Sequence, residues 1–159
     1  PRLAAVLYTH DGQSFYTDVA PPDRILKLFS KREDGQICGL ELCAIALGLS
    51  TFADHCEGHK VRVWSDNTGS ENSTRRGSAR AWDHNQIVHA IWVKAAMLGC
   101  HMIVDRVPTK DNIADLPSRE QYKLLELMGT QRVEPFLDSM FWDESAWDTL
   151  QLNSALRRS

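Results

Sequence analysis

The chain has no run of about eighteen apolar residues, which is the length that a membrane-spanning helix needs. Its first residues also lack the basic and then apolar order of a secretory signal. No internal repeat or low-complexity tract is present. These absences predict a soluble protein with no membrane partner.

The four cysteines include no CxxC pair, and Cys38 and Cys43 diverge on the helix predicted around them. We therefore expect reduced thiols and an intracellular location, in the cytoplasm or the nucleus. His55, Cys56 and His59, with Cys100 and His101 later in the chain, allow a zinc site as an alternative. Their spacing fits no standard zinc pattern, and such residues are commonly ordinary loop and core residues.

The chain has almost as many basic as acidic residues, since 21 acidic and 18 basic residues give a net charge of −3. This balance excludes a generally cationic nucleic-acid coat but allows a locally basic groove. With 159 residues, 43% of them hydrophobic, the chain is long enough for one domain with a substantial core. Because it begins with Pro1 and enters an apolar run at once, we expect a fragment of a longer protein.

The sequence predicts strands alternating with helices after an initial hairpin. Residues 2–9 and 14–19 are β-rich and flank Asp11-Gly12, a strong hairpin signal. After a short polar connection, we predict a helix from about Gln36 to Ala53 and a strand from Lys60 to Ser65.

The second half continues the alternation after a polar loop at 66–80 that is rich in Gly, Ser, Asn and Arg. Helical periodicity covers 81–98, a strand is predicted at 101–107, and a loop leads to a helix starting near Asp115. The expected fold class is α/β, with a mixed sheet flanked by helices. A helical or irregular extension at 120–159 should pack on this domain or on a partner.

Three carboxylates occupy unusual positions in this pattern. Glu41 falls near the middle of the apolar arc of the first long helix, Asp66 ends a strand, and Asp115 begins a helix. Each has an ordinary alternative, since Glu41 can reach water or pair with an arginine at a helix edge, and an Asp can cap the following segment. Buried anions are costly without compensation, so converging acids usually hold cations or share protons.

Carboxylate oxygens suit Mg²⁺ or Mn²⁺, which keep waters that a substrate phosphate can displace. Two such ions stabilise the attacking and leaving oxygens in phosphodiester hydrolysis. Glycoside hydrolysis needs only an acid and a base, so the residues by themselves leave it open.

Three motifs resemble the ribonuclease H domains of retroelement reverse transcriptases: Glu41-Leu42-Cys43-Ala44, Val63-Trp64-Ser65-Asp66-Asn67, and the segment 106–119 that contains Asn112-Ile113-Ala114-Asp115. The resemblance covers residues 2–119. It implies a ribonuclease H-like sheet, two Mg²⁺ or Mn²⁺ ions, and cleavage of the RNA strand of an RNA/DNA hybrid. Glu41, Asp66 and Asp115 would be catalytic metal ligands, corresponding to the family's second, third and fourth acids.

The first strand of that family, which carries its first acid, is not evident here, and the chain resembles the family from the second strand onward. Asp11 could replace that acid, although its position favours a hairpin turn, and Asp18 is a weaker candidate. A catalytically silent module that binds nucleic acid or scaffolds an assembly is therefore the competing hypothesis. The rest of a reverse-transcriptase polyprotein, or another chain, would then be a partner.

Basic and amide side chains follow the three acids in sequence. We expect the nucleic-acid contacts to come from Asn67, Arg75, Arg76, Arg80, Lys110 and Arg119. For each of them the alternative is a solvated surface residue or, for Asn67, a turn-forming one.

Overall fold

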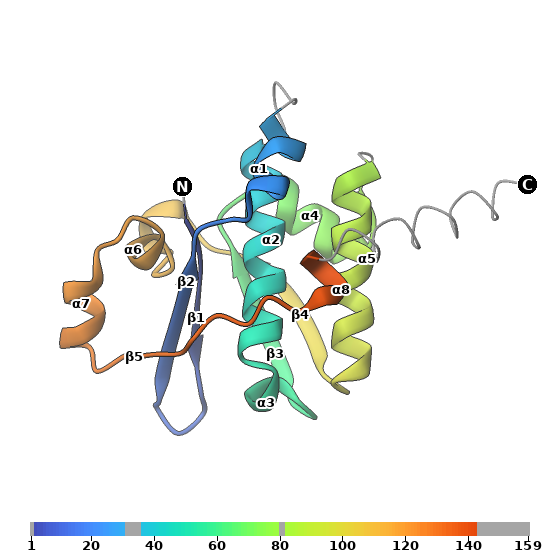
Figure 1. Ribbon diagram of the computed structural model, residues 1–159. Helices are drawn as coiled ribbons and strands as arrows, with labels where there is room; N and C mark the ends of the chain where they lie inside the picture. Colours follow the sequence, from blue (N-terminus) through green and yellow to red (C-terminus); the bar gives the residue numbers. More distant parts are fainter. Residues whose placement is uncertain (1, 31–35, 80–81, 143–159) are drawn as a thin grey trace, which may run out of the picture.

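The computed structural model describes residues 2–30, 36–79 and 82–142 of the chain. These residues form a mixed α/β fold in which helices cover small sheets (Figure 1). The elements follow the order β1 (Leu3–Tyr8), β2 (Ser14–Val19), α1 (Asp23–Ser30), α2 (Gln36–Thr51), α3 (Ala53–Cys56), β3 (Lys60–Ser65), α4 (Thr68–Arg76), α5 (Trp82–Met97), β4 (His101–Arg106), η1 (Thr109–Asp111), α6 (Asp115–Ser118), α7 (Tyr122–Leu127), β5 (Gln131–Arg132) and α8 (Ser139–Trp142).

The predicted hairpin is confirmed as the antiparallel pair β1–β2, whose register runs from Leu3 opposite Val19 to Tyr8 opposite Ser14. Its turn uses Gly12 at a φ of 84°, a conformation that glycine adopts without strain. The hydroxyl of Thr9 donates to the Asp11 carboxylate within the same turn. Asp11 is thus an exposed turn residue.

The strands fall into two separate sheets within the described part of the chain. One has the order β1-β2-β5 and contains both antiparallel and parallel pairs, and the other is the parallel pair β3–β4. The predicted strands at 60–65 and 101–107 are confirmed, the second ending at Arg106. No hydrogen-bonded ladder joins β1 to β3 among these residues, so the expected sheet is divided.

Helix α2 packs on β1 and against α4 and α5, and Figure 1 shows it between the β1–β2 hairpin and α5. Leu42 and Leu47 are fully buried in the core, together with Val88 and Ile91 of α5. The predicted boundaries of α2 and α5 agree with the structure to within two residues. In the described ranges, no helix has both the length and the apolar character needed to cross a bilayer.

Two helices lie where we expected only polar connections. Helix α1 follows Pro22 and buries Ile25, while α4 spans Thr68–Arg76 and is capped at its end by Gly77 in the left-handed conformation. Helix α4 is polar, but it buries Ser70, Thr74 and the side chain of Glu71. The polar composition therefore misled the prediction of a loop at 66–80.

The chain after residue 119 packs on the same core over its described part. Strand β5 adds to β2 in parallel, and α8 buries Phe141 and Trp142 against α5. Lys94 of α5 forms a 2.7 Å ion pair with Asp138 in the same region. Trp147, Leu150 and Leu152, which we also considered for packing, lie outside the described residues.

A buried carboxylate joins this extension to the hairpin. Asp18 is only 1% exposed and accepts hydrogen bonds from Arg2 Nε at 2.9 Å and from the Tyr122 hydroxyl at 2.5 Å. Arg132 Nε lies 3.4 Å from its other oxygen. The hydrogen bond from its hydroxyl to Asp18 raises the pKa of Tyr122. Asp18 is therefore held by cations and a hydroxyl, and this weak candidate for the first acid has a structural role.

Asp18→Ala should lower the free energy of unfolding by about 3 kcal/mol, because Arg2 and Arg132 would lose the buried carboxylate that they share. Urea unfolding monitored by circular dichroism measures this change. Glu126→Ala, at an exposed position of α7, is the matched control and should change stability by less than about 0.5 kcal/mol. Equal effects of the two substitutions would contradict a structural role for Asp18.

Candidate functional site

Glu41 enters the interior on the second turn of α2. Its neighbours Leu42 and Cys43 are buried in the core, and its own side chain lines the cavity between β1 and β3. A glutamate here is costly because burial disfavours its charged form. The apolar arc in the sequence therefore contains a carboxylate that the fold half-buries.

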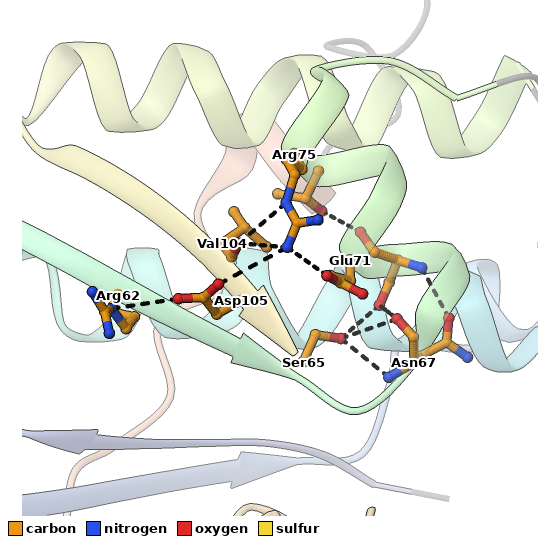
Figure 2. Close-up of polar contacts among 9 residues, drawn as sticks. Arg62, Ser65, Asn67, Glu71, Arg75, Val104 and Asp105 are labelled. Carbon is orange, nitrogen blue, oxygen red and sulfur yellow. Dashed lines mark hydrogen bonds and ion pairs between the residues drawn. The ribbon is translucent and has the colours of Figure 1, made fainter. Parts of the chain in front are cut away.

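Asp66 is the first residue after β3, in a turn held by hydroxyl and amide groups (Figure 2). Ser65 Oγ lies 2.7 Å from Ser70 Oγ, and the Asn67 side chain accepts from Ser70 N at 2.9 Å. Asn67, not Asp66, is thus the N-cap of α4. Asp66 was the alternative candidate for this cap, but Asn67 makes the capping bond instead. The Asp66 carboxylate is therefore not used for capping and is available to the site.

Asp115 begins α6 after a turn in which the Asn112 side chain accepts from Ala114 N at 3.1 Å. The Asp115 carbonyl accepts from Ser118 Oγ at 3.0 Å and from Arg119 N at 3.1 Å. These bonds hold the backbone of Asp115 and involve no oxygen of its carboxylate. Arg119 Nη2 lies 3.7 Å from that carboxylate, with its own side chain 67% exposed.

The three acids act on one another electrostatically, although 25 residues separate the first two and 49 the last two in sequence. Burial raises the pKa of Glu41 to about 7, and the negative charges of Asp66 and Asp115 contribute further. Burial and Asp66 also raise the pKa of Asp115, whereas Arg119 lowers it. These electrostatic effects link Glu41, Asp66 and Asp115 into one cluster of acids.

The donor set of this cluster consists of carboxylate oxygens, the ligands preferred by hard cations such as Mg²⁺ and Mn²⁺. A cation beside Glu41 would offset the repulsion that raises its pKa. In the described residues, no three His, Cys, Asp or Glu side chains already stand in a metal-binding arrangement. The donors fit such ions by their chemistry.

The other acids and thiols that the sequence suggested lie elsewhere. Asp11 occupies the hairpin turn beyond Tyr8. This turn lies near the end of α2, because Phe15 of the hairpin stacks on His55 of α3 with 4.8 Å between the ring centroids. Asp66, in contrast, lies at the other end of α2, where α4 approaches Cys38. Asp11 is thus remote from the cluster.

Burial raises the pKa of the Cys56 thiol to about 11, which disfavours the thiolate that zinc requires.

The predicted nucleic-acid residues divide by their surroundings. Arg75 Nη2 donates to Glu71 at 2.5 Å and to the Val104 carbonyl at 3.1 Å, and Figure 2 shows it bridging α4 and β4. Arg75 and Asn67 therefore make structural contacts. Arg76, Lys110 and Arg119 are exposed, and Arg80 lies outside the described residues.

Glu71 was not among the predicted site residues; it is 5% exposed and pairs with Arg75 four residues later. The pair fixes α4 to β4 directly behind the turn that carries Asp66. In this pair the acid precedes the base by four residues, which is the favourable orientation on a helix. The spacing could therefore have predicted the pair from the sequence. Glu71 thus supports the candidate site without belonging to the cluster.

The raised pKa of Glu41 predicts a pH-dependent stability that Glu41→Gln should remove. Between about pH 4.5 and 7 the folded protein retains a proton that the unfolded chain has released, so stability falls as pH rises through this window. Urea unfolding at pH 5 and pH 8 should show that the glutamine variant loses roughly 2–3 kcal/mol less than the unsubstituted protein. The exposed substitution Glu126→Gln should not change the difference, and an unchanged difference in Glu41→Gln would contradict the cluster.

Comparisons with known proteins leave the family of the chain open. A scan against protein-family models finds no match, and searches of curated proteins and of solved structures also find none. The function must therefore be argued from the geometry of the carboxylate cluster and the fold around it.

Proposed function

We propose that the cluster of Glu41, Asp66 and Asp115 is the metal site of a ribonuclease H-like endonuclease, which cleaves the RNA strand of RNA/DNA hybrids within a retroelement reverse transcriptase. The observation that carries this proposal is the electrostatic coupling of three acids from distant parts of the chain. The three motifs that resemble this family are the ones that contain these acids.

The arrangement of elements supports the proposal. An antiparallel hairpin precedes the helix that carries Glu41, Asp66 follows a strand, and Asp115 follows that strand's parallel partner β4. Such carboxyl ends of parallel strands are where open α/β sheets bind ligands. A ribonuclease H-like sheet is therefore our proposal for the finer fold class.

The chemistry would follow from what the side chains can hold. When bound, two Mg²⁺ or Mn²⁺ ions supply Lewis acidity and lower the pKa of a water. The carboxylates of Glu41, Asp66 and Asp115 would provide the oxygen ligands. A Glu41 pKa of about 7 means that its proton leaves near neutral pH, so that the site gains its full negative charge there.

Substrate binding would depend on exposed cations on the elements around the three acids in sequence. Lys110 lies in η1 shortly before Asp115, and Arg76 lies in the last turn of α4. Phosphate contacts by such residues give affinity without sequence preference, as a hybrid-specific nuclease needs. The proposed substrate is therefore a nucleic-acid backbone, recognised by its shape and charge.

A catalytically silent module is the second candidate, favoured by the count of acids. The resemblance implies four acidic metal ligands. Asp11 is remote from the cluster and Asp18 makes structural contacts, so three acids remain as ligands. In this alternative the cluster and its surrounding cations bind a hybrid without cleaving it.

Asp66→Asn should reduce cleavage of the RNA strand by about 100-fold or more, because it removes a charge that the site holds near the reacting phosphate. The assay follows a labelled RNA/DNA hybrid with Mg²⁺ or Mn²⁺ by gel electrophoresis, using this chain and an amino-terminally extended version. Duplex DNA and duplex RNA serve as substrate controls.

Asp111→Asn is the matched substitution for this assay, since Asp111 is exposed in η1 and should leave the cleavage rate unchanged. Cleavage that survives Asp66→Asn would refute the proposed site. Absence of cleavage by both chain lengths, with retained binding of the hybrid, would instead establish the silent module.

Arg76→Ala and Lys110→Ala should each lower the slope of log affinity against log salt concentration by about one, because each removes one phosphate contact. Fluorescence anisotropy with a labelled hybrid at several salt concentrations measures the slope. Arg75→Ala is the informative comparison, since Arg75 is engaged with Glu71 and should mainly lower stability. An equal slope in Arg76→Ala and the unsubstituted protein would exclude Arg76 from the contact surface.

A further inference from the structure

Two turns that each carry a cysteine adjoin at the amino ends of β3 and β4. The first turn, 56–59, follows α3 and contains Cys56, and the second turn, 98–101, follows α5 and contains Cys100. Two backbone hydrogen bonds of 2.9 Å join the turns, from Gly58 N to the Leu98 carbonyl and from His101 N to the His59 carbonyl. The fold therefore places two cysteines that are distant in sequence on neighbouring backbone segments.

Both cysteine side chains lie on the core side of the β3–β4 pair. Cys56 is 3% exposed and lines the same cavity as Val61 of β3. Cys100 directly precedes β4 and packs against the core cluster that contains Cys56 and Met102. Val61 and Met102 are themselves partners in the β3–β4 register. The two thiols thus approach the same part of the core from adjoining turns.

The two thiols also influence each other's ionisation. Burial raises the pKa of Cys56 to about 11, and the charge of Cys100 contributes to this rise. Burial raises the pKa of Cys100 as well, but Cys100 is half-buried whereas Cys56 is buried. Cys100 is therefore the thiol that an oxidant in solution reaches first, and Cys56 is reached from inside the fold.

The histidines beside these cysteines are engaged in other contacts. His59 Nδ1 lies 2.8 Å from the Glu57 carbonyl, and the His55 ring stacks on Phe15. Within the part of the chain that the structure describes, no three His, Cys, Asp or Glu side chains are arranged to hold a metal ion. The neighbouring sulfurs are thus better suited to a bond with each other than to a shared metal.

A glycine in each turn gives the backbone beside the cysteines room to adjust. Gly58 and Gly99 have φ values of 72° and 60°, and a Cβ atom added to either would meet no atom within 4 Å. Neither turn is confined by packing at its glycine. Small backbone shifts there can bring two cysteines to the narrow geometry that a disulfide requires.

We propose that Cys56 and Cys100 are a site of oxidative modification, at which a low-molecular-weight disulfide such as oxidised glutathione converts the two thiols into an intramolecular disulfide. The Cys100 thiolate attacks the oxidant and releases one thiol, and the Cys56 thiolate then attacks the Cys100 sulfur and releases the second. The cysteines lose two electrons and two protons in total, and the oxidant gains them as two free thiols.

The disulfide closes the loop 57–99 and ties the end of α3 to the start of β4. It stabilises the folded chain because it restricts the unfolded one. Asp66 follows the carboxyl end of β3, whereas both cysteines lie at the amino ends of β3 and β4. The inference therefore does not rest on the proposed nuclease function.

The test incubates the full chain with oxidised glutathione at pH 7 and pH 9, blocks the remaining thiols by alkylation and maps the peptides by mass spectrometry without reduction. The expected product is a Cys56–Cys100 linked peptide that forms faster at pH 9, because the thiolate fraction of both cysteines is larger there. The Tm of the oxidised chain should rise by roughly 5–10 °C and return to its original value with dithiothreitol. A lasting glutathione adduct at Cys100 without the linked peptide, or a linkage between other cysteines, would overturn the proposal.

Serine substitutions test the assigned pair. Cys100→Ser should abolish both the linked peptide and the rise in Tm, and its half-buried position makes it the safer variant to fold than a substitution of buried Cys56. Cys38→Ser is the matched control, since Cys38 is also half-buried and lies on the first turn of α2. It should keep both the linked peptide and the rise in Tm. If Cys38→Ser and Cys100→Ser have the same effect on the linked peptide, the assigned pairing is wrong.

Discussion

The structure depends on the packing of one apolar helix between a sheet and the helices that cover a second sheet. Helix α2 contacts β1 on one side and α4 and α5 on the other, and it buries Leu42, Leu47 and Leu49. Helices α4 and α5 in turn pack on the β3–β4 pair. Within the described residues no backbone ladder joins the two sheets, so the side chains buried on α2, α4 and α5 connect them.

The same helix explains why the candidate site is sensitive to charge. A glutamate on a helix that is buried on several sides loses hydration, and two further acids increase the cost of ionising it. The contacts that support the backbone next to the acids are local in sequence: Asn67 caps α4 beside Asp66, and Asn112 closes the turn before Asp115. The backbone is thus organised around carboxylates whose mutual repulsion favours binding of cations or protons.

The sequence predicted the elements that have a strong period or clear boundaries. The strand Lys60–Ser65 lies between Gly58 and Asp66, and α5 has apolar residues at helical spacing. Helix α4 was missed because its core contacts are made by Ser70, Thr74 and Glu71, so no apolar stripe marks it. Strand β5 has two residues and arises from pairing with β2, 116 positions from Phe15 to Gln131, which no local pattern encodes. The apolar arc and the ends of strands and loops drew attention to Glu41, Asp66 and Asp115, whereas the burial of Asp18 depends on Arg132 and Tyr122 from distant segments.

The divided sheet and the carboxylate cluster meet at Glu41, which belongs to the cluster and also lines the cavity between β1 and β3. The hydration of that cavity therefore sets how much water reaches the Glu41 side chain. Lower hydration disfavours the charged form and strengthens every nearby electrostatic interaction. The cavity and the cluster consequently share one side chain, so a change in the hydration of the cavity changes the charge that Glu41 carries and with it the repulsion among the three acids.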